Sequence, residues 1–359
     1  MGKTLVIAEK PSVGRDIARV LGANAKGEGT LSGGDWIVSW AVGHLVTLCD
    51  PEELNPAWKR WSMEQLPMLP EELKTKVIPG KTRAQYNLLK KLMNDKGVDR
   101  IVCATDSGRE GELIFRYIYH QAGCKKPVDR LWISSMTDAA IREGFAAIKP
   151  DSCYDGLYES ARCRSEADWL VGMNASRAYT LRYDALLSVG RVQTPTLCLI
   201  VQRDREIEAF VPRDYWEIQA NFGDYTGSWI DPQSKETKCF DEQLAQAICG
   251  RVKGQTGTVT LSKREKKRMP SPQLYDLTEL QRDANKRYGY TAKQTLDYAQ
   301  SLYEKKLLTY PRTDSRYLTV DMAETASVVL HLAARVPPFD ACPEFFPDVA
   351  ALVNDKEVS

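Results

Sequence analysis

The first 150 residues alternate short apolar segments, which suit buried strands, with longer segments whose apolar residues recur at helical spacing. Strands are expected at residues 4–8, within 36–46, at 100–104 and at 131–133. Helices are expected from Pro11 through Leu21, after residue 104 through Ile118, and over 139–148. Proline is well tolerated in a first helical turn, which supports the first of these helices. This alternation is typical of an open α/β sheet.

The predicted secondary structure changes three times along the chain, at about residues 151, 213 and 271. Residues 151–212 are predicted to be helical, with a helix starting at Thr194-Pro195, and residues 213–270 to form short strands separated by turns. Residues 271–359 are predicted to be helical again, with Thr291 as the cap of a helix that ends at Lys305-Lys306. The expected fold class is therefore α/β plus mainly α, in four domains with these boundaries.

Composition excludes several classes of protein. The chain has nine cysteines but no Cys-x-x-Cys pair, and only three histidines, so a zinc ribbon, a disulfide framework or a histidine metal centre is not indicated. The net charge is +1, and the basic run over residues 263–268 is typical of a solvated segment. No apolar run reaches the roughly 18 residues of a membrane span, and the start lacks the features of a signal peptide. We therefore expect a cytoplasmic protein with no membrane association.

Two acidic residues follow predicted strands of the sheet. Glu9 and Asp106 are both expected at the carboxyl edge of parallel strands, where open α/β sheets bind ligands. Clustered carboxylates suit Mg²⁺, although acids at a helix start are also favoured by the helix dipole alone. Lys10 and Arg109 would either hold a phosphate beside the metal or simply balance charge.

Two further segments carry candidate chemistry. Arg191 and Gln193 precede a predicted helix start, which suits either an anion site or an ordinary capping loop. In Tyr310-Pro311-Arg312, proline favours extended backbone, so the tyrosine and arginine side chains would project from one face. They could then act on one phosphate as nucleophile and charge clamp. The alternative is a turn with a packed aromatic ring.

Six segments in order along the chain together resemble the motifs of type IA DNA topoisomerases, most closely the topoisomerase III branch. They are residues 7–12 (IAEKPS), 42–45 (VGHL), 104–112 (ATDSGREGE), 167–178 (ADWLVGMNASRA), 190–196 (GRVQTPT) and 308–314 (LTYPRTD). The resemblance implies a Rossmann-like Toprim domain at 1–150 and a helical DNA-binding domain, part of the family's fourth, at 151–212. It also implies a β-rich arch segment at 213–270 and an incomplete, winged-helix-like catalytic-tyrosine domain at 271–359.

The resemblance implies transient cleavage of one DNA strand. Tyr310 would attack a phosphate and form a 5′-phosphotyrosyl bond, while Arg312 and Lys10 stabilise charge and Glu9 handles the proton of the leaving 3′-oxygen. A strand would pass through the gap before the 3′-hydroxyl reverses the attack, relaxing negative supercoils or decatenating DNA. No ATP would be needed, and the chain has no Walker-type phosphate loop.

The resemblance also implies ligands and partners. Mg²⁺ would be held by Glu9, Asp106 and Glu110. DNA, single-stranded or negatively supercoiled, would be contacted by Arg109, Arg164, Asp168, Arg177, Arg191 and Gln193. A helicase or a single-strand-binding protein is the expected protein partner, and the chain is expected to be a monomer.

The sequence departs from the family pattern in two places. Gly108 stands where the family's Asp-x-Asp-x-Glu motif has its second aspartate, which should weaken metal binding unless Glu110 or Glu112 compensates. The chain ends before the family's segment with a phosphate-contacting histidine, and His331 is not expected to replace it. We therefore expect an amino-terminal portion of such an enzyme.

Two other functions are compatible with parts of the sequence. A truncated fragment could hold single-stranded DNA without cleaving it. A Toprim-containing nuclease or primase would explain residues 1–150, but it would give no purpose to the segments around Arg191 and Tyr310.

Overall fold

The computed structural model describes residues 2–133, 136–267, 269, 272–305, 307–313, 315–337, 339–341 and 349–358. The chain divides into two compact units, one made of Met1–Gly190 with Ser271–Ser359 and the other of Arg191–Pro270. Lys306 and Asp314, which belong to predicted segments, lie outside the described residues. No described helix is long and apolar enough to cross a membrane.

A seven-stranded sheet organises the first unit, with strand order β2-β3-β4-β1-β7-β8-β9. The strands are β1 Lys3–Ala8, β2 Ala25–Gly27, β3 Thr30–Gly33, β4 Trp36–Trp40, β7 Val98–Ala104, β8 Val128–Arg130 and β9 Lys149–Pro150. β4, β1, β7 and β8 run parallel, whereas the outer strands pair antiparallel. The predicted α/β sheet is therefore confirmed.

One predicted strand is displaced. A strand was expected at residues 131–133, but the structure has it at Val128–Arg130 (β8). Two charged residues of this strand, Asp129 and Arg130, are buried. Arg130 pairs with the equally buried Glu112, so a charged residue occupies a position where the sequence pattern favoured an apolar one. The apolar residues that suggested the strand follow it instead.

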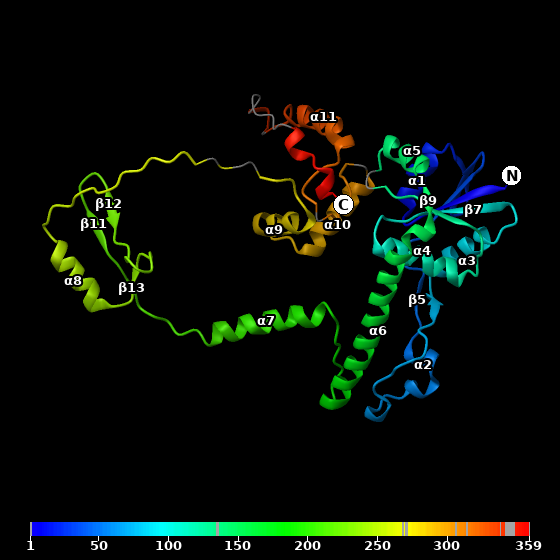
Figure 1. The fold of residues 1–359 in the computed structure, drawn as a ribbon, viewed down its shortest axis with the longest axis horizontal. Coiled ribbons are helices and arrows are strands. Elements are labelled where there is room, and N and C mark those ends of the chain that lie inside the picture. The colour runs from blue at the N-terminus through cyan, green and yellow to red at the C-terminus, as the bar shows by residue number, and fades with distance from the viewer. Residues whose placement is uncertain are drawn as a thin grey trace. The chain divides into compact units, whose positions relative to one another are not determined.

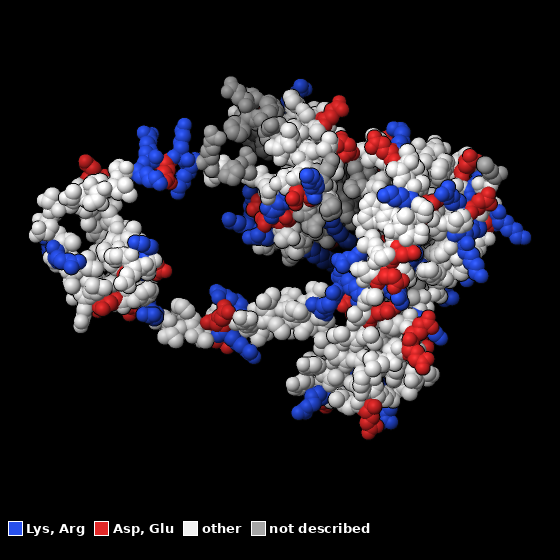
Figure 2. All heavy atoms as spheres, in the orientation of Figure 1, with Lys and Arg blue, Asp and Glu red and all other residues white. Residues whose placement is uncertain are grey.

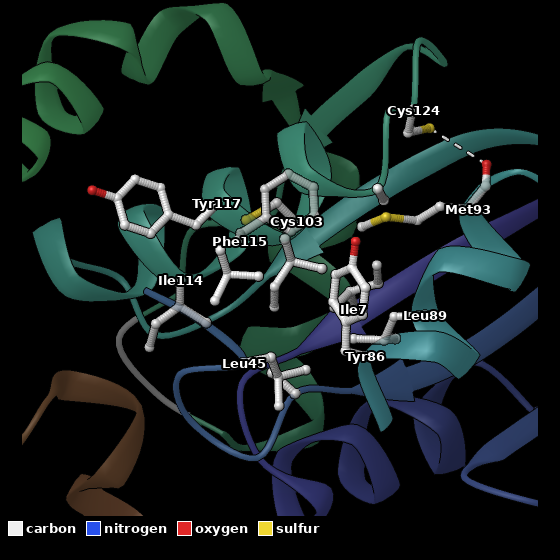
Figure 3. Close-up of a cluster of buried hydrophobic side chains, with 14 of the residues drawn as sticks. Ile7, Leu45, Tyr86, Leu89, Met93, Cys103, Ile114, Phe115, Tyr117 and Cys124 are labelled. Atoms are coloured by element: carbon white, nitrogen blue, oxygen red, sulfur yellow. Dashed lines mark hydrogen bonds between the residues drawn. The ribbon is translucent and has the colours of Figure 1, made fainter. Parts of the chain in front are cut away.

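Helices cover both faces of the sheet (Figure 1). Side chains alternate along a strand, so Leu5 and Ile7 join one cluster while Val6 and Ala8 join the other. The first cluster is shared with α3 Thr82–Met93 and α4 Arg109–Gln121, as Figure 3 shows for its inner side chains. The second is shared with α1 Pro11–Val20 and α5 Asp138–Ala146.

A long helix, α6 Asp155–Tyr183, packs against α4. Its Trp169 is buried, and the indole Nε1 donates to the carbonyl oxygen of Cys49 at 3.0 Å. Cys49 lies in the loop between the short hairpin strand β5 Val46–Leu48, which pairs with β6 Thr75–Val77, and helix α2 Pro51–Leu54. This hydrogen bond joins α6 to the loop between β5 and α2.

The carboxyl-terminal part of this unit is helical, as predicted. Its helices are α9 Leu277–Tyr288, α10 Ala292–Glu304 and α11 Ala323–Ala333. Thr291 caps α10 through a reciprocal capping box with Gln294. Residues 307–313, which include Tyr310, follow α10 and form neither helix nor strand.

The second unit contains α7 Gln193–Glu208, the strands β10 Trp216–Glu217, β11 Gln219–Asn221, β12 Thr226–Ser228 and β13 Lys238–Cys239, and α8 Glu242–Val252. The expectation of strands alone over 213–270 was wrong for α8. Asp241 caps this helix by accepting a hydrogen bond from the Leu244 amide, and Ala245 and Ile248 face the small core of the unit.

Candidate active site

The carboxyl edge of β1 and β7 brings the two predicted acids together. The strands are adjacent and parallel, and Ala8 pairs with Ala104, so Glu9 and Asp106 leave the sheet side by side. The backbone amide of Asp106 donates to Oε2 of Glu9 at 3.2 Å. Two carboxylates therefore share this edge.

Lys10 joins these carboxylates to the distant tyrosine. Its Nζ lies 2.7 Å from Oδ2 of Asp106 and 3.4 Å from Oε1 of Glu9, and it donates to the Tyr310 hydroxyl at 2.9 Å. Burial works against its charge, but the hydrogen bonds to Asp106 and Tyr310 outweigh it and hold the pKa of Lys10 above its usual range. The residue is a fixed cation at the centre of the site.

Glu9 is the most buried of the acids at this edge. Burial, followed by the neighbouring charge of Asp106, raises the pKa of the Glu9 carboxyl. Both effects penalise negative charge there, so this position favours a proton or an additional cation.

Tyr310 and Arg312 line a common cavity of about 390 Å³ together with Lys10, Asp106 and Tyr303. The rings of Tyr303 and Tyr310 meet edge to face with centroids 5.4 Å apart. Pro311, which lies between Tyr310 and Arg312 in sequence, is buried, while Arg312 is exposed. The side chains of Tyr310 and Arg312 therefore line the same cavity, and the chain bends at Pro311.

A second cavity, of about 600 Å³, is also lined by Lys10. It is lined by Glu9, Lys10, Pro11, Ser12, Arg15, Val42, Gly43, His44, Glu110, Ile114, Gln300 and Arg312. Sequence analysis assigned no role to Arg15, His44, Gln300 or Tyr303. Only His44 carried a signal, because it follows Gly43 in one of the six motifs. Gly43 has φ of 81°, a conformation that favours glycine.

Glu110 pairs with His44 and lines the second cavity together with Glu9. Its Oε1 lies 2.5 Å from Nε2 of His44 at the wall of the second cavity. Glu112 does not compensate for Gly108, because it is completely buried and pairs with Arg130 and Arg116, each at 3.0 Å. Compensation by Glu112 was therefore a wrong expectation.

The donor set at the strand edge fits Mg²⁺. Glu9 and Asp106 supply hard oxygen ligands next to a cavity, and burial, followed by the charge of Asp106, raises the pKa of Glu9. Cys103, Glu112 and Asp151 also lie close enough to bind an ion. However, the guanidinium groups of Arg130 and Arg116 already pair with the carboxylates of that second group. The strand edge is the better metal site.

The predicted DNA contacts occupy different environments. Arg109, at the start of α4, is exposed, as are Arg164 and Asp168, one turn apart on α6. Arg177 is buried instead. Its guanidinium donates to the carbonyl oxygen of Trp58 at 2.6 Å and lies 4.9 Å from the Trp61 ring, so it contacts protein rather than solvent.

Arg191 and Gln193 belong to the second compact unit. Both are exposed, and Gln193 is the first residue of α7, one position before the predicted start. Exposed basic side chains of this unit also include Lys263, Arg264, Lys266 and Lys267. Acidic and basic groups are interspersed over the visible surface (Figure 2).

Comparison with known proteins identifies the family to which this chain belongs. A family model of the Toprim domain matches residues 4–136, so the chain contains a Toprim domain. A DNA topoisomerase family model matches residues 152–350, and the chain therefore belongs to the DNA topoisomerase family.

Individual relatives agree with this assignment. DNA topoisomerase 3 of Bacillus subtilis (strain 168) is 51% identical over 326 residues, which cover 90% of this chain and 45% of that protein. DNA topoisomerase 3 of Shouchella clausii is 50% identical over 341 residues, covering 94% and 46%. The chain thus spans about half the length of these relatives. Full-length topoisomerase I from Thermotoga maritima shares the fold with a TM-score of 0.59 at 24% identity, covering 93% of this chain and 53% of that one.

Proposed function

We propose that this chain carries the strand-cleaving centre of a type IA DNA topoisomerase. The observation that supports the proposal best is the position of Lys10, which contacts the Asp106 carboxylate and the Tyr310 hydroxyl at once. A nucleophile, a fixed cation and two metal-compatible acids thereby share one site. The alternative interpretation of Tyr310, a packed aromatic ring in a turn, does not explain why these groups lie together.

The reaction proposed is reversible transesterification. The Tyr310 oxygen attacks a phosphorus of one DNA strand and loses its proton to solvent water. A phosphotyrosyl bond forms at the 5′ end, and the bond to the 3′-oxygen breaks. Lys10 favours negative charge on the attacking oxygen, and Lys10 with Arg312 stabilises the phosphate as charge develops. The leaving 3′-oxygen takes a proton from Glu9, whose raised pKa suits a proton donor. The 3′-hydroxyl later reverses each step.

Mg²⁺ is the proposed cofactor, with Glu9 and Asp106 as ligands and Glu110 as a third acid nearby. When bound, it would supply positive charge beside the phosphate. Arg109, Arg164, Asp168, Arg191 and Gln193 remain the proposed DNA contacts, and Arg177 is proposed to support α6 from within.

The activity of the whole protein is also part of the proposal. It would pass a strand of single-stranded or negatively supercoiled DNA through the break without ATP, as a monomer in the cytoplasm, with a helicase or single-strand-binding protein as partner. A nuclease or primase is disfavoured, because the family match extends from residue 152 to 350, well beyond the Toprim domain.

A labelled single strand incubated with the protein and Mg²⁺, then separated on a denaturing gel, tests the chemistry. A protein-linked 5′ end that disappears in Tyr310→Phe would support the proposal. Salt-sensitive DNA binding without an adduct would favour a fragment that holds DNA but does not cut it. Cleavage that persists in Tyr310→Phe would contradict the proposal.

A further inference from the structure

A fully buried arginine lies next to the turn that carries Asp106. Arg130, on β8, donates through Nη1 to the carbonyl oxygens of Thr105 at 2.8 Å, Leu131 at 2.9 Å and Cys103 at 3.2 Å. Its Nη2 donates to the carbonyl oxygen of Asp106 at 2.8 Å. The guanidinium thus binds the backbone on which β7 ends and the acidic turn begins.

The charge of Arg130 is balanced inside the protein. Its Nε donates to Oε2 of Glu112 at 3.0 Å, and neither side chain has any exposed surface. A buried charge is tolerated only when it is paired and its donors are satisfied. Breaking this arrangement would remove a donor from four carbonyl oxygens, which is costly in a buried site. The Cys103 and Asp106 carbonyls would keep bonds from the Leu131 and Gly108 amides, so the Thr105 and Leu131 carbonyls would be affected most.

The turn itself has little freedom once these bonds form. The Gly108 amide donates to the same Asp106 carbonyl at 2.9 Å, and the Thr105 hydroxyl donates to the carbonyl of Gly111 at 2.8 Å. A Cβ on Gly111 would lie only 2.1 Å from the Asp106 carbonyl oxygen, so the turn and the first turn of α4 are in close contact. The Asp106 carbonyl therefore accepts bonds from Arg130 of β8 and from the Gly108 amide, and a third bond joins Thr105 to α4.

We propose that Arg130, with Glu112 as its counter-charge, is a positioning residue for the active site. It fixes the backbone of the acidic turn so that the Asp106 carboxylate meets Lys10 and Glu9, and it thereby sets the affinity of this edge for a divalent cation. The inference rests on the proposed function, in which Asp106 is a metal ligand. Groups that orient metal ligands in this way change metal affinity by about 10- to 100-fold when altered.

Arg130→Lys is the main test, because it keeps the positive charge and removes the planar fork. We expect amide hydrogen exchange at Asp106 and Gly108 to accelerate about tenfold or more, and the Mg²⁺ dissociation constant, measured by calorimetry without DNA, to rise by about tenfold. Exchange in β1 should stay unchanged. Arg142→Lys, at a side chain that is 65% exposed on α5, is the matched control and should behave as wild type.

Glu112→Gln, measured in parallel, keeps the side-chain shape and removes only the counter-charge. It should shift exchange and Mg²⁺ affinity in the same direction by a smaller factor, which keeps the inference testable if Arg130→Lys does not fold. Wild-type exchange and Mg²⁺ affinity in a folded variant would overturn the inference. If wild type forms no DNA adduct while these shifts occur, the proposed function fails and the positioning role stands.

Discussion

Lys10 and Tyr310 are 300 residues apart in sequence, yet the ammonium of the first donates to the hydroxyl of the second at 2.9 Å. The same ammonium lies 4.5 Å from the centroid of the tyrosine ring. Because Lys10 also contacts Asp106, the nucleophile and the acidic edge are joined through one side chain. A change at Lys10 should therefore affect the reaction more than the fold.

Lys10→Gln is expected to lower formation of the covalent DNA adduct by about 100-fold, which is typical for loss of one donor to a developing charge. Lys10→Arg should recover part of this loss, since it keeps the charge. The adduct would be quantified from a labelled single strand on a denaturing gel. Lys3→Gln, at an exposed lysine that begins β1, is the control. Equal losses in Lys10→Gln and Lys3→Gln would contradict the assigned role.

Gly108→Asp tests the missing acid of the metal motif. Gly108 has an extended backbone with φ of −179°, and a Cβ there would meet nothing within 4 Å, so an aspartate fits without strain. The added carboxylate should lower the Mg²⁺ concentration needed for half-maximal religation. Gly108→Asn adds the same bulk without the charge and should resemble wild type. Superimposable Mg²⁺ titrations of Gly108→Asp and wild type would refute this expectation.

Gly111→Ala tests the close contact between the acidic turn and α4. The new Cβ would collide with the Asp106 carbonyl oxygen, and such overpacking costs about 1–3 kcal/mol of unfolding free energy. Gly108→Ala, two residues beyond Asp106 in open space, should leave the free energy nearly unchanged. Urea denaturation of both variants measures the difference. Similar midpoints would show that the turn can move away from the helix.

The position of the acidic edge was predictable from sequence, because parallel strands bring their carboxyl ends to one side of a sheet. Two apolar strands followed by Glu9 and Asp106 were enough to place these acids together. The contact with Tyr310 was not predictable from local pattern, since it depends on how the carboxyl-terminal helices pack onto the sheet.

The directions of the acidic side chains at this edge were also not predictable from the sequence pattern. Glu110 and Glu112 are two residues apart at the start of α4, but one reaches His44 at a cavity wall and the other is buried with Arg130. Burial of that ion pair also explains the displaced strand, since Arg130 interrupts the apolar pattern of β8. Paired charges in a core give no apolar periodicity to detect.

Asp151 should make the stability of the protein depend on pH. Burial, followed by the charge of Glu112, raises the pKa of the Asp151 carboxyl to about 7 from its usual 3.8. The folded state therefore binds a proton that the unfolded state releases, so this group costs stability as pH rises from about 4 to about 7. Each pKa unit corresponds to about 1.4 kcal/mol.

Asp151→Asn removes this titration. The melting temperature of the variant minus that of wild type should increase as pH rises through this window. Thermal unfolding in buffers from pH 5 to pH 8 measures this difference. Asp155→Asn is the control, because Asp155 also pairs with Arg116 at 2.8 Å but its side chain is 58% exposed. A difference between Asp151→Asn and wild type that stays constant with pH would show that Asp151 keeps its charge throughout, paired with Arg116.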